Sequence, residues 1–146
     1  MLRWNKRGLL FDPGSQPRWW LREFAQAPST LLFDDFLRVY FSGRPAPDRA
    51  GQYVSYSGFV DLDRNDLARV LRVGDEPILP LGGTGEFDEF GTYPVSVCRE
   101  GDKVVAYYGG WTRCEAVPFD VAIGHAVSTD GGLRFRKSGR GPVLGC

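Results

Sequence analysis

The stretch VYFSGR, Val39 to Arg44, recurs further along the chain as AYYGGW, Ala106 to Trp111, and this recurrence decides the fold class. Both stretches are rich in the β-branched and aromatic residues that favour β-strands. Three further landmarks recur in the same order: Pro28 and Pro94, FVDLD at 59–63 and AVSTD at 126–130, and PIL at 77–79 and PVL at 142–144. One unit of about 66 residues therefore occurs twice in the chain.

Each unit contains four candidate strands, and helical periodicity over a window of about 11 residues is absent. The 19 glycines and 10 prolines separate short apolar runs. We expect strands at residues 29–33, 37–42, 52–61 and 67–73, and again at 93–98, 103–111, 120–128 and 133–137. Four antiparallel strands per repeat is the pattern of a β-propeller blade. The sequence therefore predicts an all-β fold of two four-stranded antiparallel blades.

Two blades do not close a propeller, which needs at least about four. We expect residues 1–146 to form a partial propeller domain, with the first blade at about 17–79, a connector at 80–92 and the second blade at 93–144. An incomplete ring leaves sheet faces and edges uncovered. This predicts either a fragment of a longer protein or a chain that completes its ring as a homo-oligomer.

Composition excludes several classes of partner. Lys plus Arg and Asp plus Glu both total 18, so no basic excess is available for nucleic acid. No apolar run is long enough to span a membrane or to form a signal-peptide core. Three widely spaced cysteines and one histidine indicate neither a disulfide framework nor a metal site. We expect a cytoplasmic protein without nucleic-acid, membrane or metal binding.

Three segments carry a resemblance to a known family: FAQAPSTLLFDDFLRVYFSGR at 24–44, GEFDEFGTYPVSV at 85–97 and AIGHAVSTDGGLRF at 122–135. They resemble bacterial five-bladed propellers identified as glycosidase-like proteins, often encoded near surface-glycan biosynthesis genes. These are similar to the β-mannoside phosphorylases and hydrolases of glycoside hydrolase family 130. The resemblance would cover the first two blades of such a protein.

The resemblance implies a carbohydrate-active protein of glycoside hydrolase or phosphorylase type, with a carbohydrate as substrate, a β-mannoside being one candidate. It implies no cofactor, with inorganic phosphate as co-substrate if the reaction is phosphorolysis. The alternative is a non-catalytic glycan-binding or assembly module in surface-polysaccharide biosynthesis. For the isolated chain we expect no catalysis, because a site on the propeller axis draws residues from several blades.

The resemblance also nominates catalytic residues on the inner strands. Gln26 stands where many related hydrolases carry an aspartate, and an amide cannot serve as nucleophile or general base, so Gln26 is expected to contact substrate. The stretch EFDEFGTYP matches the position of the family's acid and nominates Asp88, with Glu89 as the alternative. The proline and arginine that follow this acid in family 130 are absent here. The other interpretation is an acidic loop with no catalytic role.

One acid fits phosphorolysis better than hydrolysis. Cleaving a glycosidic bond with water usually needs two carboxylates, whereas inorganic phosphate is itself an anionic nucleophile. A first blade with Gln26 and a second blade with Asp88 therefore favour the one-acid pattern.

Arg44 and Trp111 end corresponding strands of the two units and are candidate substrate contacts. Arg44 would bind a sugar hydroxyl or phosphate, Trp111 would stack on a pyranose face, and Arg113 would help to hold an anion. The alternative is an inter-blade ion pair and a packing tryptophan.

A turn motif common in propellers, S-x-D-x-G-x-x-[W/F] or Asp-box, is matched by Ser128, Asp130, Gly132 and Phe135. Asp and Gly suit a tight hairpin turn, so a structural role is expected. Asp61 and Asp63 align with Ser128 and Asp130 and are therefore also interpreted as turn residues.

Overall fold

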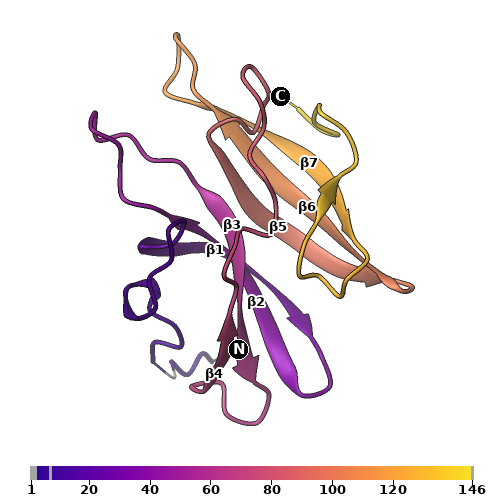
Figure 1. The fold of residues 1–146 in the computed structure, drawn as a ribbon. Coiled ribbons are helices and arrows are strands. Elements are labelled where there is room, and N and C mark those ends of the chain that lie inside the picture. The colour runs from indigo at the N-terminus through magenta and orange to yellow at the C-terminus, as the bar shows by residue number, and fades with distance from the viewer. Residues whose placement is uncertain (1–2, 7, 146) are drawn as a thin grey trace.

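The computed structural model describes residues 3–6 and 8–145, and within them two four-stranded antiparallel sheets (Figure 1). The strands are β1 (Glu23–Leu32), β2 (Phe36–Arg44), β3 (Tyr56–Asp63) and β4 (Val70–Val73) in the first sheet, and β5 (Gly91–Glu100), β6 (Lys103–Thr112), β7 (Asp120–Ser128) and β8 (Arg136–Lys137) in the second. A short 3-10 helix, η1 (Pro13–Ser15), precedes them, and the described residues contain no α-helix. Each strand pairs with the next one along the chain. The predicted fold class is confirmed, and the arrangement is consistent with an incomplete propeller.

Strand β1 begins at Glu23 rather than at the predicted Ser29, because its first half is irregular. The register with β2 shifts twice there, and Phe24 and Ala27 have φ values of 63° and 50°. Non-glycine residues rarely adopt this left-handed conformation. The sequence of this half carries no regular strand pattern, which explains the shorter prediction.

The two sheets share an irregularity at the same place of their first strand. In β1 the register shifts between Gln26 and Ser29, and in β5 it shifts between Pro94 and Ser96. Before the shift, Gln26 lies opposite Ser42, and Tyr93 lies opposite Gly109. Tyr93 comes one repeat unit after Gln26, and Gly109 comes one repeat unit after Ser42. Tyr93 therefore occupies in the second sheet the position that Gln26 occupies in the first.

A shared hydrophobic core joins the two sheets. Tyr40 and Phe59 from the first sheet pack with Val104, Tyr108 and Ala126 from the second. Adjacent strand residues point to opposite faces, so Phe41, next to Tyr40, lies in a separate cluster on the other face of the first sheet. There, Phe41, Val60, Leu62 and Val73 are covered by Trp20 and Leu21 from the segment before β1.

A buried ion pair reinforces the junction between the sheets. Arg38 Nε lies 2.7 Å from Asp61 Oδ1, its NH2 lies 2.8 Å from Asp61 Oδ2, and its NH1 donates to the Gly131 carbonyl. Tyr40 donates to the Gly132 carbonyl at 3.0 Å, and burial raises the pKa of Tyr40 to about 12. The prediction that Asp61 is a turn residue is wrong, because Asp61 lies within β3 and neutralises a cation that would otherwise be buried alone.

The turn between β7 and β8 is held by its own side chains. Asp130 Oδ1 accepts from the Leu133 and Arg134 amides at 3.0 and 3.1 Å, and Ser128 Oγ accepts from the Gly132 amide at 2.9 Å. Burial alone would raise the pKa of Asp130, but these backbone bonds and the Ser128 hydroxyl hold it below its ordinary value. In the first sheet, Asp63 likewise accepts from two amides of its turn.

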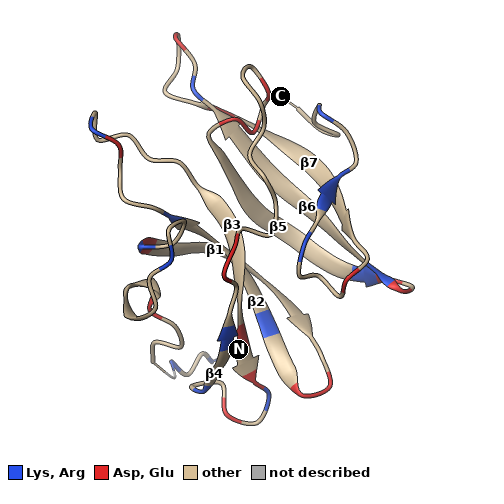
Figure 2. Ribbon diagram, viewed as in Figure 1, with Lys and Arg blue, Asp and Glu red and all other residues tan. Residues whose placement is uncertain are grey.

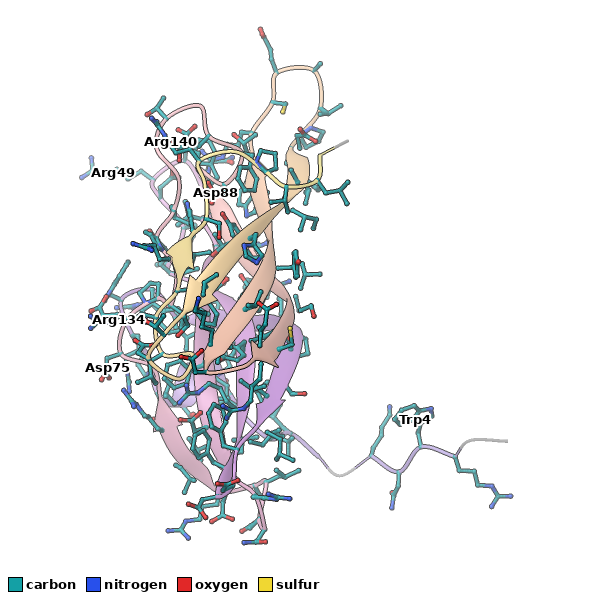
Figure 3. The ribbon with its side chains drawn as sticks, turned by 90° about the vertical axis from the view of Figure 1, so that its right-hand side faces the viewer. Trp4, Arg49, Asp75, Asp88, Arg134 and Arg140 are labelled. Carbon is teal, nitrogen blue, oxygen red and sulfur yellow. The ribbon has the colours of Figure 1, made fainter. Side chains whose placement is uncertain are left out.

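Charged residues gather in the loops and at the sheet edges, and β6 and β7 are mostly uncharged (Figure 2). On the face of the second sheet turned away from the first, Tyr107 and Val121 are 44% and 40% exposed. The segment that carries Trp4 extends away from both sheets, and Trp4 is 92% exposed (Figure 3). Among residues 3–6 and 8–145, no helix is long and apolar enough to cross a membrane.

Candidate functional site

One end of the two sheets gathers the beginnings of β1 and β5, the ends of β2 and β6 and the loops that follow them (Figure 1). The strand register produces this, since Glu23 lies opposite Arg44 and Gly91 lies opposite Trp111. The predicted contacts Arg44, Trp111 and Arg113 therefore reach the same end of the molecule.

Arg44 ends β2 with its guanidinium against two aromatic rings, 5.1 Å from the Phe24 centroid and 5.3 Å from that of Tyr53. One of its nitrogens donates to the Tyr93 hydroxyl at 3.4 Å, whereas its Nε is buried without a hydrogen-bond partner. Glu23 is the cross-strand neighbour, but its carboxylate accepts from the Tyr53 hydroxyl at 2.9 Å. The predicted alternative of an inter-blade ion pair is not seen for Arg44 within the described chain.

Arg113 follows β6 and lies over the Phe90 ring, 4.2 Å from its centroid. It donates to the Tyr53 carbonyl at 3.0 Å, which ties it to the loop between β2 and β3. Phe90 also lies 6.0 Å from the Trp111 ring and donates its amide to the Trp111 carbonyl. Phe90 therefore supports both the tryptophan and the arginine.

Two adjoining cavities open at this end. The larger one, about 400 Å³, is lined by Arg44, Tyr53, Trp111 and Arg113 among others. The smaller one, about 140 Å³, shares Arg44 and Trp111 and adds Tyr93. The structure thus brings three of the four predicted binding residues to the larger cavity, where Tyr53 joins them.

Gln26 lies apart from these cavities, in the irregular half of β1. It is half-buried between Phe24 and Ala27, the two residues with positive φ, and its Oε1 is buried without a partner. Each such non-glycine conformation costs about 1–3 kcal/mol and tends to occur at functional sites.

Asp88 is fully buried in the connector, which ends where β5 begins at Gly91. Its Oδ2 lies 2.6 Å from Lys137 Nζ in β8 and accepts from the Tyr108 hydroxyl of β6 at 3.0 Å. Its Oδ1 has no partner. Burial first, and the nearby Asp88 second, raise the pKa of Tyr108 above its ordinary range. The Asp88 side chain is 1% exposed, so a substrate cannot reach it in this conformation.

The other acidic residues of the connector bind the chain itself. Glu89 accepts from the Gly85 amide at 2.8 Å, within the same loop. Glu86 accepts from the Gly83 amide and pairs with Arg140, and the hydrogen bond from Arg140 is the main cause that lowers the pKa of Glu86. Asp88 and Arg140 lie close to this loop at the same end of the molecule (Figure 3). Every carboxylate of EFDEF therefore fastens the connector.

The sequence interpretation missed Tyr53, Tyr93, Tyr108 and Lys137. Tyr93 could have been found, because it stands one repeat unit after Gln26. Its hydroxyl also shares a hydrogen bond with Ser55 Oγ at 3.2 Å. Lys137 had no local signal, since its meeting with Asp88 depends on the folded second sheet.

These features define a partial β-propeller with an aromatic and cationic cavity at one end. Across 95% of its length, the chain resembles the structure of Zg3597, a family 117 glycoside hydrolase of the marine bacterium Zobellia galactanivorans. The TM-score is 0.74, the identity is 18%, and the match covers 38% of that enzyme. This likeness shows the fold and does not point to family 130 in particular.

No protein-family model matches the chain. It is 34% identical over 143 residues to the uncharacterized proteins MT1551 and Rv1502 of Mycobacterium tuberculosis, from two strains. The match covers 98% of this chain and 46% of each relative, so the chain spans about half the length of the curated relatives it matches.

Proposed function

We propose that this chain recognises a carbohydrate in the larger cavity, as part of a carbohydrate-active propeller. The observation that carries the proposal is the grouping of Trp111 with Arg44, Arg113 and Tyr53 around one open space of about 400 Å³. Ligand sites are concave, with aromatic walls and a few converging polar groups. The glycosidase-like fold supports the same class of ligand.

The chemistry of the wall suits a sugar ring. The face of Trp111 offers an apolar platform for the C–H groups of a pyranose, while the guanidinium groups and tyrosine hydroxyls offer hydrogen bonds to its oxygens. Gln26 of β1 lies outside this cavity, and we propose it as a separate polar contact through its unpartnered carbonyl oxygen. The two arginines are held by aromatic rings and backbone, so they are positioned before a ligand arrives.

For the complete protein we propose action on a glycoside, by hydrolysis or phosphorolysis as in family 130, with Asp88 or Glu89 as general acid. A general acid must come within hydrogen-bond reach of the leaving oxygen. Because Asp88 is buried against Tyr108 and Lys137, this role requires the connector to move away from β6 and β8. The isolated chain is accordingly expected to release no product from a β-mannoside, with or without phosphate, as followed by chromatography.

Binding is tested by titrating the chain with methyl β-D-mannopyranoside and mannobiose in an isothermal calorimeter. W111A should weaken binding about fivefold or more, because a stacked aromatic face contributes on the order of 1–3 kcal/mol to ligand affinity. W4A is the matched control, since Trp4 projects into solvent far from the cavity. Equal affinity of W111A and the parent chain would contradict the proposal.

A further inference from the structure

The cations of the molecule divide into two groups. Five Arg or Lys side chains of the described residues are buried or half-buried: Arg18, Arg38, Arg44, Arg113 and Lys137. Three of them pair with a carboxylate, namely Arg18 with Asp75, Arg38 with Asp61 and Lys137 with Asp88. Within the part of the chain that the structure describes, Arg44 and Arg113 have no such pair, and these two line the same cavity. Two cations therefore line the cavity, and no carboxylate of the described residues pairs with either of them.

No acidic side chain of the described residues lines the cavity wall. The larger cavity is lined by Gly51, Gln52, Tyr53, Cys114, Pro118 and Phe119 in addition to Arg44, Trp111 and Arg113. In the strand register Glu23 lies opposite Arg44, and its carboxylate is engaged by the Tyr53 hydroxyl. Asp120 lies opposite Thr112, and its Oδ1 accepts from the Val121 amide. A half-buried guanidinium without a counter-ion is unfavourable, and an oxyanion that accepts from two such groups removes that cost.

We infer that the cavity binds a sugar that carries an anionic group, such as a uronate carboxylate or a phosphate ester. The inference rests on the proposed function and adds the substrate class to it. The anion belongs to the sugar rather than to a free ion because the cations share their cavity with Trp111 and Tyr53, whose faces suit an attached ring. Arg44 and Arg113, which line the cavity without a carboxylate partner, are the donors that such an anion would engage.

The test compares four probes by calorimetry: mannose, mannose 6-phosphate, mannuronate and inorganic phosphate. Either anionic sugar should bind at least about tenfold more tightly than mannose, since charge-assisted hydrogen bonds are about twice as strong as neutral ones. The preference should shrink as salt is raised past about 0.1 M, where screening acts within about 10 Å. Free phosphate should bind more weakly than mannose 6-phosphate.

Variants assign the effect to the cavity. R44Q and R113Q should each weaken binding of the anionic sugar about tenfold more than binding of mannose, because only the anion loses a charge-assisted hydrogen bond. R44K should restore part of the preference for the anionic sugar. R49Q is the control, because Arg49 is an exposed arginine of the loop after β2 that lies outside the cavity. If R44Q does not fold, the preference for the anionic sugar measured in R113Q tests the inference alone.

Two results would overturn the inference while leaving the proposed function intact: equal affinity for mannose and both anionic sugars, or a preference that survives in R113Q. Free phosphate binding as tightly as mannose 6-phosphate would also overturn it, because the ion alone would then be the ligand. Failure of all sugars to bind would remove the proposed function as well.

Discussion

The two sheets are covered at equivalent positions, the first by apolar side chains and the second by side chains that include an ion pair. In the first, Trp20 and Leu21 lie over Gly43 of β2; in the second, at the equivalent positions of the repeat, Phe87 and Asp88 lie over Gly110 of β6. The ring of Trp20 is 6.0 Å from that of Phe41, and the ring of Phe87 is 5.9 Å from that of Tyr108, which is again an equivalent pair. The N-terminal segment and the connector therefore cover their sheets in equivalent ways.

The difference lies in three equivalent positions. Leu21, Phe41 and Val73 of the first sheet correspond to Asp88, Tyr108 and Lys137 of the second, with Val73 opposite Val60 and Lys137 opposite Ala126 in matching strand pairs. The first set is a continuous apolar cluster, and the second is an ion pair with a hydroxyl donor. Because the apolar set folds the same architecture, the polar set is not required by the fold.

Removing only the cation should give the largest effect. K137M leaves Asp88 buried and uncompensated, which typically costs about 3–5 kcal/mol. Since the Lys137 side chain is 14% exposed, we expect the lower end, about 3 kcal/mol, in urea unfolding followed by tryptophan fluorescence. The equivalent change in the first sheet, V73M, alters volume without stranding a charge and should cost about 1 kcal/mol. Equal costs would mean that the ion pair contributes no more than packing.

Substitution of the glycine beneath the covering segment should also cost more stability in the second sheet than in the first. A Cβ at Gly110 would lie 2.5 Å from both Asp88 Cβ and the Phe87 ring, so G110A should cost about 2 kcal/mol. At Gly43 the nearest obstacle is the flexible end of Leu21, which can shift, so G43A should cost less. G139A is the control, since nothing lies within 4 Å of its Cβ. Thermal unfolding of the three variants ranks them.

Alkaline pH should lower the unfolding free energy through the second sheet but not through the equivalent position of the first, because Tyr108 titrates and Phe41 does not. Burial raises the pKa of Tyr108 above its unfolded value of about 10. Its stabilising contribution is complete below about pH 10 and is lost as pH rises toward the folded pKa, since the unfolded chain then releases the proton more readily. Between about pH 10 and 11 the parent should therefore lose unfolding free energy faster than Y108F, by about 1 kcal/mol.

Tyr40 also contributes to the loss of stability at alkaline pH. Its pKa is also raised by burial, to about 12, so Y108F should keep part of the alkaline sensitivity. Identical pH profiles for the parent and Y108F, measured by urea unfolding at each pH, would contradict the prediction.

The sequence predicted the strands because their patterns are local, and it placed Arg44 and Trp111 at the ends of corresponding strands because the repeat fixes the order. Arg44, Trp111 and Arg113 share a cavity for this reason. It could not predict that Asp61 pairs with Arg38, because the sequence repeat aligns Asp61 with Ser128 and so suggested a turn role. Ser128 ends β7 and bonds to the turn that follows. Nor could it foresee that Asp88 is closed off by Lys137, because that contact depends on the connector and β8, which are far apart in the chain, being folded together.

Transplanting the apolar solution into the second sheet should have the smallest effect on stability and is the sharpest test of the comparison. The triple variant D88L/Y108F/K137V places Leu, Phe and Val where the first sheet has Leu21, Phe41 and Val73. Replacing a buried ion pair by apolar residues is often neutral or stabilising, so unfolding free energy should stay within about 1 kcal/mol of the parent. The same variant removes the proposed acid. A stable triple variant that still binds mannosides, placed in a protein of the relatives' full length, should lose turnover. Retained turnover in that protein would mean that Asp88, Tyr108 and Lys137 only attach the connector to the second sheet and take no part in catalysis.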